Sequence, residues 1–121
     1  MGVTGIGGLF FRSQDPDARA AWYREHLGIE AGHADIWQQQ AGMTVFAPFP
    51  ADSDYFPAEQ PFMLNLRVAE LDALAAKLEG EGIAVERRPE WTTEYGDFAR
   101  IHDPEGLPIE LWEPPSGPGP R

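Results

Sequence analysis

Apolar and polar residues alternate along several short stretches of the chain, and two longer stretches repeat their apolar residues at helical spacing. Alternation predicts strands, because successive side chains of a strand point to opposite faces, whereas helical spacing predicts one apolar stripe. The clearest alternation runs from Phe98 to Glu113, around a turn at 103–106 whose sequence is DPEG. We therefore expect a hairpin there, with Ile109 and Leu111 on one face and Glu110 on the other.

The order strand, helix, three strands can be traced twice along the chain. The elements expected in the first half are a strand at 6–12, a helix from Pro16 to Gly28 capped by Ser13 or Asp15, and strands at 29–33, 36–40 and 43–47. Those expected in the second half are a strand at 62–68, a helix at 70–79, a strand at 83–88 and the two strands of the hairpin. The sequence thus predicts an α+β fold made of two βαβββ modules.

These elements belong to one domain, since the chain of 121 residues has the length of a single core. We expect module one at about 5–48, a connector at 49–61, module two at 62–114 and a disordered tail at 115–121. The connector is rich in Pro, which cannot donate to a strand ladder. Its aromatic stretch at 52–56 is either a lid whose Tyr55 and Phe56 close on a ligand, or a connector whose two aromatic side chains are buried in the core or in a dimer interface.

Charge and composition narrow the possible partners. The net charge is −11, which argues against nucleic acid and anionic membranes as partners, because both attract basic surfaces. Cysteine is absent, so disulfides and thiolate metal sites are excluded and a cytoplasmic location is expected. No stretch has the pattern of a signal peptide or of a membrane span.

Three motifs carry a resemblance to a known superfamily. They are the pair Trp22-Tyr23 followed by His26-Leu27-Gly28, the stretch VAELDAL at 68–74, and the DPEG turn followed by PIEL at 108–111. The chain resembles the vicinal oxygen chelate superfamily, which includes glyoxalases, bleomycin-resistance proteins and extradiol dioxygenases. The resemblance implies that the two modules form an incomplete barrel around a concave ligand cup, and that the protein is a homodimer.

The resemblance also indicates where metal ligands would lie in metal-dependent members. The matching positions in this chain are Gly8, Val45, Met63 and Glu110. Only Glu110 is a competent ligand, and one carboxylate does not hold a divalent cation. We therefore expect no metal site and no other cofactor. A divalent metal is the main alternative, and it would require a strand register shifted by one residue.

The expected strand parities place a mixed set of aromatic, basic and acidic side chains in the cup. The set comprises Phe10, Arg12, Asn65, Arg67, Arg100, His102, Glu110 and Trp112. Several guanidinium groups in one concavity would hold a carboxylate or phosphate, so the predicted ligand is a small anionic organic molecule with an apolar part. The alternative is that the arginines lie at the rim or pair with Glu110 and acidic loops.

Two residues of this set are candidate catalytic groups. A partly dehydrated Glu110 could act as a general base, or it could serve only as counter-ion to Arg12 or Arg100. His102 could move a proton, or it could simply bond within the neighbouring turn.

Three functions are compatible with these features. The first is a bleomycin-resistance-like protein that sequesters a small molecule and needs no catalytic group. The second is a glyoxalase-like lyase or isomerase with Glu110 as base, in which Arg12, Arg67 or His102 stabilises the developing enolate. The third is a structural module whose cup is filled by its own side chains. Whether the protein is an enzyme stays open at this point.

Overall fold

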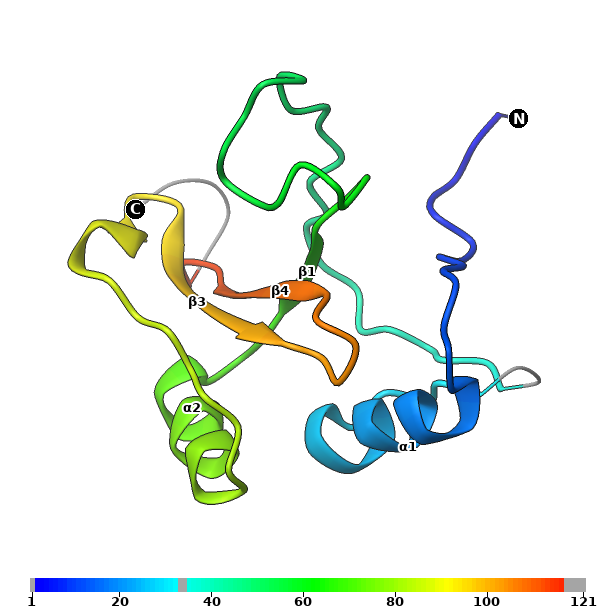
Figure 1. The fold of residues 1–121 in the computed structure, drawn as a ribbon. Coiled ribbons are helices and arrows are strands. Elements are labelled where there is room, and N and C mark those ends of the chain that lie inside the picture. The colour runs from blue at the N-terminus through cyan, green and yellow to red at the C-terminus, as the bar shows by residue number, and fades with distance from the viewer. Residues whose placement is uncertain (1, 33–34, 117–121) are drawn as a thin grey trace. The chain divides into compact units, whose positions relative to one another are not determined.

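The computed structural model describes residues 2–32 and 35–116. It consists of two compact units, Met1–Trp37 and Gln38–Arg121 (Figure 1). None of the described helices is long and apolar enough to cross a membrane. His33, at the end of an expected strand, and 117–121, in the expected disordered tail, lie outside the described residues.

Helix α1, Pro16–Leu27, is the regular element of the first unit. The Asp15 side chain caps it by accepting a hydrogen bond from the Ala18 amide at 3.1 Å. Gly28 ends the helix in the left-handed conformation, with φ of 69°. The helix predicted from Pro16 to Gly28, with Asp15 as one possible cap, is therefore confirmed.

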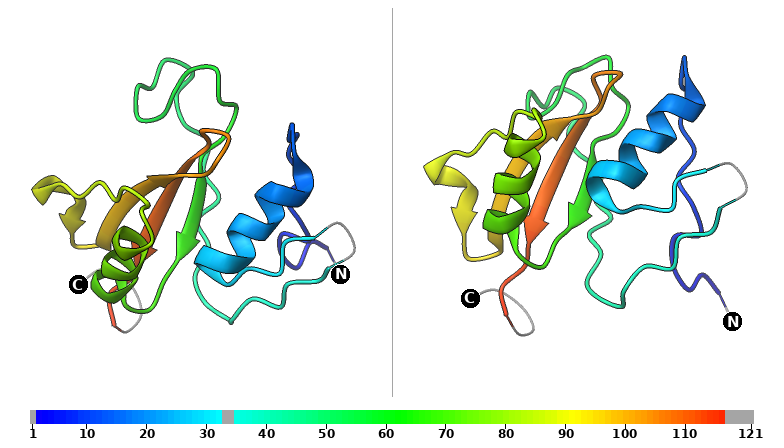
Figure 2. Two further views of the ribbon diagram at one scale, coloured as in Figure 1. Left: turned by 60° about the horizontal axis from the view of Figure 1, so that its bottom comes forward. Right: turned by 90° about the horizontal axis from the view of Figure 1, so that it is seen from below.

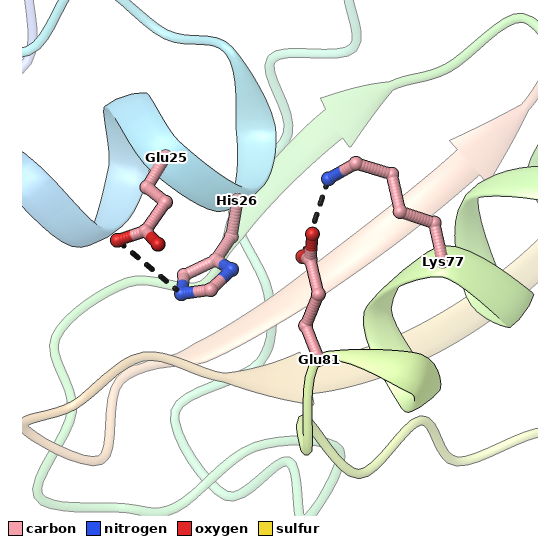
Figure 3. Close-up of polar contacts among 4 residues, drawn as sticks. All are labelled: Glu25, His26, Lys77 and Glu81. Atoms are coloured by element: carbon pink, nitrogen blue, oxygen red, sulfur yellow. Dashed lines mark hydrogen bonds and ion pairs between the residues drawn. The ribbon is translucent and has the colours of Figure 1, made fainter.

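Two side chains of α1 bind the residues that precede the helix. Arg19 is buried, donates to the Arg12 carbonyl at 2.9 Å, and lies 4.7 Å above the Phe11 ring. Tyr23 is also buried and meets the same Phe11 ring edge-on. In the last turn, His26 lies 4.0 Å from the Glu25 carboxylate (Figure 3). Arg19 and Tyr23 together hold the segment around Phe11 against the helix.

The other elements expected in the first half do not form. The described residues at 6–12, 29–32, 36–40 and 43–47 contain no strand. Several of their apolar side chains face solvent: Phe10 is 94% exposed, Ile36 81% and Phe46 89%. A strand is stable only when its backbone groups pair with a neighbour, and these segments have none in the described chain. This part of the prediction is not confirmed.

The second unit is built on a four-stranded sheet in the order β1-β4-β3-β2 (Figure 2). The strands are β1 Leu64–Arg67, β2 Thr92–Thr93, β3 Gly96–His102 and β4 Pro108–Glu113. Strand β4 pairs with β3 in antiparallel and with β1 in parallel orientation. The predicted hairpin is thus confirmed as β3 and β4, and its turn is closed by the Gly106 amide, which donates to the Asp103 carbonyl at 3.0 Å. The fold is mixed α and β with an open sheet.

Helix α2, Leu71–Gly80, covers one face of this sheet (Figure 2). Ile101, Ile109 and Leu111 share one face of β3 and β4 and have no exposed surface, and neither has Leu78 of the helix. Each such side chain stabilises the fold by about 1.5–3 kcal/mol through burial. Figure 3 also shows an ion pair of 3.2 Å between Lys77 and Glu81, which contributes little because its side chains reach solvent.

Between α2 and β3 the structure departs from the expected strand at 83–88. Only one isolated bridge forms there, between Glu86 and Arg100, and it is followed by a short 3-10 helix, η1 Pro89–Trp91. The turn from β2 into β3 depends on Gly96, whose φ is 123°. A Cβ at this position would lie 2.2 Å from the Glu113 carbonyl oxygen, so only glycine fits.

Candidate functional site

The sheet face opposite α2 carries several polar side chains. Asn65 of β1 and Arg100 of β3 both lie directly beside Glu110 of β4 in the strand register, and Arg67 lies beside Trp112. Partners in register share a face, so these five side chains emerge on the same side. We call this surface the Glu110 face.

Glu110 is the centre of this face and is only 8% exposed. One carboxylate oxygen accepts a hydrogen bond from the Asn65 amide nitrogen at 2.7 Å. The other accepts a short hydrogen bond from the Tyr55 hydroxyl. Both oxygens are therefore engaged, which is how a carboxylate is retained at a buried position.

Tyr55 comes from the connector and was not among the site residues expected from the sequence. Burial, followed by the hydrogen bond to Glu110, raises the pKa of Tyr55 to about 12. The phenol therefore keeps its proton at neutral pH and acts as the donor to Glu110. The expectation for 52–56 left a lid and a buried connector open, and neither singled out this contact.

Arg100 lies between aromatic rings. Its guanidinium carbon is 4.8 Å from the centre of the Tyr55 ring and 5.6 Å from that of Trp91. One terminal nitrogen donates to the Tyr55 carbonyl at 2.8 Å and lies 3.7 Å from the Met63 sulfur. The Nε atom is buried and has no hydrogen-bond partner. Arg100 thus keeps one N–H donor that the described chain does not satisfy.

The guanidinium of Arg67, unlike that of Arg100, bonds to two backbone carbonyls. It donates to the carbonyl of Gln40 at 2.6 Å and, by a short hydrogen bond, to that of Met43. Gly42 permits this approach, since a Cβ there would lie 2.6 Å from the guanidinium carbon. In this structure Arg67 holds the turn at 40–43, and its expected role in binding a ligand stays a prediction.

His102 and Trp112 occupy opposite ends of the same face. His102 is exposed beside Pro108, at the turn of the hairpin. The turn bonds are made instead by the Asp103 carboxylate, which accepts from the amides of Glu105 and Leu107. The proton-transfer role of His102 is not tested by this geometry.

Trp112 is buried and fixed from two sides. Its indole nitrogen donates to the Tyr95 carbonyl at 2.8 Å, and its ring stacks on Phe98 with the centroids 6.2 Å apart. It is therefore a rigid aromatic wall of the Glu110 face. Phe10 and Arg12 belong to the first unit, and their expected place in the ligand cup stays a prediction.

The residues present do not fit the metal site that the resemblance implies. Gly8, Val45 and Met63 offer neither a carboxylate nor an imidazole, and both oxygens of Glu110 already accept hydrogen bonds. Within residues 2–32 and 35–116, no three His, Cys, Asp or Glu side chains come together as a possible metal site.

Comparison with known proteins places the chain in a family. The family model described as a glyoxalase-like domain matches residues 8–112. The chain belongs to this family. No curated protein matches this glyoxalase-like domain.

Two solved structures are similar to the glyoxalase-like domain over most of its length. TnmS3, an antibiotic binding protein from Streptomyces sp. CB03234, is 28% identical with a TM-score of 0.63, over 95% of this chain and 99% of TnmS3. A glyoxalase/bleomycin resistance protein from the same source is 29% identical with a TM-score of 0.51, over 83% of this chain and 92% of its own.

Proposed function

We propose that this glyoxalase-like domain binds a small organic molecule, of the antibiotic type, on the Glu110 face and without a metal ion. The observation that carries the proposal is Arg100 Nε, a buried donor without a partner beside the rings of Tyr55 and Trp91. The similarity to TnmS3, an antibiotic binding protein, spans nearly the whole chain and supports the same reading.

The chemistry of Arg100 indicates what the ligand offers. A buried donor left unsatisfied costs about 1–3 kcal/mol, which an acceptor oxygen of a ligand would recover. A carboxylate suits a guanidinium especially well, in keeping with the anionic ligand expected from the sequence. The neighbouring Trp91 ring favours a flat apolar part on the same molecule.

Binding is favoured over catalysis by the state of Glu110. In this structure each carboxylate oxygen already accepts one hydrogen bond, from Tyr55 or from Asn65, so Glu110 serves as a fixed hydrogen-bond acceptor. No observation favours the lyase or isomerase with Glu110 as base. The proposal is therefore a protein that acts by holding its ligand.

We also propose that the protein is a homodimer in which both halves complete their βαβββ modules. Apolar side chains at 3–11 and 36–49 are exposed in the single chain, among them Phe10, Val45 and Phe46. Exposed apolar stretches of this extent are typical of protein interfaces. Strand β1 lies at the edge of the sheet, where its outer backbone groups could pair with a further strand. The incomplete barrel around the ligand cup would then form in the dimer.

The binding proposal is tested by thermal unfolding with bleomycin, tetracycline and 2-naphthoate as probes. At a concentration of 100 times Kd, a bound probe should stabilise the protein by about 2.7 kcal/mol, a rise of several degrees in Tm. In Arg100→Gln the rise should be lost, because the acceptor oxygen of the probe has no guanidinium to bind. Arg88→Gln is the matched control, since Arg88 also lies over the Trp91 ring, at 5.0 Å, but is exposed.

Two results would contradict the proposal. One is the absence of any Tm rise with all three probes in the wild-type protein. The other is an equal rise in wild type and Arg100→Gln, which would place the ligand away from Arg100.

A further inference from the structure

Tyr55 makes three contacts with the two charged residues at the centre of the Glu110 face. Its hydroxyl donates to Glu110, its backbone carbonyl accepts from Arg100, and its ring lies over the Arg100 guanidinium. Arg100 and Glu110 are direct partners in the strand register, yet in the described chain no ion pair joins them. Their polar groups are turned to Tyr55 instead.

We propose that the Tyr55 side chain occupies the place of the ligand in the protein without ligand. The ligand is then an aromatic compound that bears a hydroxyl group next to a carbonyl or carboxylate. The inference rests on the proposed function and deepens it by naming the ligand class. The hydroxyl of the ligand donates to Glu110, its acceptor oxygen binds Arg100, and its ring replaces that of Tyr55.

The geometry of the strand pair requires that one ligand carries both the hydroxyl and the acceptor oxygen. Directly opposed residues of an antiparallel pair have Cβ atoms about 4.5–5.5 Å apart, so one small molecule can reach both side chains. A carboxylate alone would bind Arg100 but leave Glu110 without the donor that Tyr55 supplies. A hydroxyl on the neighbouring ring carbon provides a donor for Glu110, as Tyr55 does.

Tyr55 belongs to a small group of side chains that contact one another within the connector and can leave the sheet together. Phe49 packs on Tyr55 at 5.9 Å and on Phe56 at 5.6 Å between ring centres, and Phe49 remains 48% exposed. The Ser53 amide closes a turn within the same segment by donating to the Pro50 carbonyl at 3.0 Å. Most of these contacts lie inside the connector, so they survive when it leaves the sheet.

Because Tyr55 is covalently part of the chain, it competes with a free ligand for the same place. A group held on a short linker acts at an effective concentration of about a millimolar, so it lowers the apparent affinity of any free ligand for the same place. The apparent Kd equals the intrinsic Kd divided by the fraction of molecules in which Tyr55 is displaced. Removing the Tyr55 side chain should therefore tighten binding.

The test compares two probes that differ by one methyl group. 1-Hydroxy-2-naphthoate carries the hydroxyl next to the carboxylate, and 1-methoxy-2-naphthoate has no hydrogen to donate. The dissociation constants are measured by calorimetry for wild type, Tyr55→Ala and Tyr55→Phe, with Tyr95→Phe as control. Tyr95 is a tyrosine of the same unit that is 57% exposed.

The hydroxy probe should bind Tyr55→Ala about tenfold more tightly than wild type, the value of one good hydrogen bond removed from the competitor. Tyr55→Phe keeps the ring and the backbone carbonyl, so its gain should be smaller, and Tyr95→Phe should match wild type. The methoxy probe should bind Tyr55→Ala at least about tenfold more weakly than the hydroxy probe. If Tyr55→Ala does not fold, the inference is tested by whether Tyr55→Phe binds the hydroxy probe more tightly than wild type does.

The possible failures are distinguishable. Weaker binding of the hydroxy probe to both Tyr55 variants would make Tyr55 part of the ligand site and overturn the inference, while the proposed function would stand. Equal binding of the two probes would overturn the ligand class in the same way. If neither these probes nor the three earlier ones bind any variant, both proposals fail.

Discussion

At the scale of single residues, Tyr55 shows how strongly a few contacts can change an ordinary side chain. A phenol normally has a pKa of 10.0, and here burial and the Glu110 carboxylate raise the pKa to about 12. A raised pKa means that the folded protein holds this proton more tightly than the unfolded chain does. The contribution of Tyr55 to stability is therefore complete below pH 10 and is lost as the pH rises toward 12.

This pH dependence can be measured by the absorbance of tyrosinate. The wild-type protein should show a titration step near pH 12 that Tyr55→Phe lacks. Over the same range the free energy of unfolding of wild type should fall toward that of Tyr55→Phe. A step near the ordinary pKa of 10.0 that is present in wild type and missing from Tyr55→Phe would show that Tyr55 does not bond to Glu110 in solution.

The sequence predicted some of the residues of the Glu110 face but not others. Asn65, Arg100 and Glu110 could be placed on one face because strand side chains alternate with a period of two. Tyr55 could not, because the connector has no periodicity that would aim a side chain. The need for glycine at position 96 could not be predicted either, since the atom that leaves no room for a Cβ is the carbonyl oxygen of the distant Glu113.

At the scale of elements, helix α2 is capped by a residue far from it in sequence. Glu70, at the N-cap, makes no side-chain hydrogen bond. The Leu71 amide instead donates to the Glu113 carboxylate at 2.6 Å, at the end of β4. A carboxylate at this point satisfies a free amide and interacts favourably with the helix dipole, so it also joins the helix to the sheet.

Replacing this cap should weaken the helix and the sheet together. We expect Glu113→Ala to lower the free energy of unfolding by about 1 kcal/mol, the usual cost of losing an N-terminal cap. Glu70→Ala, which removes a carboxylate without a capping bond, should cost clearly less. Urea unfolding of both variants measures the difference, and equal losses would show that Glu113 is not the cap.

Elements whose signals are local were predicted well, and those that depend on a distant partner were not. The capping residue Asp15, the terminator Gly28 and the DPEG turn each act within a few residues of the chain. The strands expected at 6–12, 36–40 and 43–47 also rest on alternation, but pairing needs a neighbouring strand that alternation does not provide. Their apolar residues are the ones left exposed in the single chain.

At the scale of the whole molecule, those exposed residues predict association. Light scattering should give about twice the chain mass of 13.4 kDa. Phe46→Glu should shift the protein toward the monomer, because it places a charge on a side chain that is 89% exposed in the single chain and buried in the proposed dimer. Tyr95→Glu, at a position that is 57% exposed outside these segments, should leave the dimer intact. A wild-type monomer would contradict the dimer proposal.

Strand β4 has a consequence for how the chain is made. It lies between β1 and β3 and is the last strand of the described residues, so β1 has no partner until residues 108–113 have been synthesised. Contacts between residues this far apart form late, and apolar segments that wait for them are open to aggregation. A ribosome that stalls before residue 108 therefore releases a chain that cannot assemble its sheet, however many of its other elements are already complete.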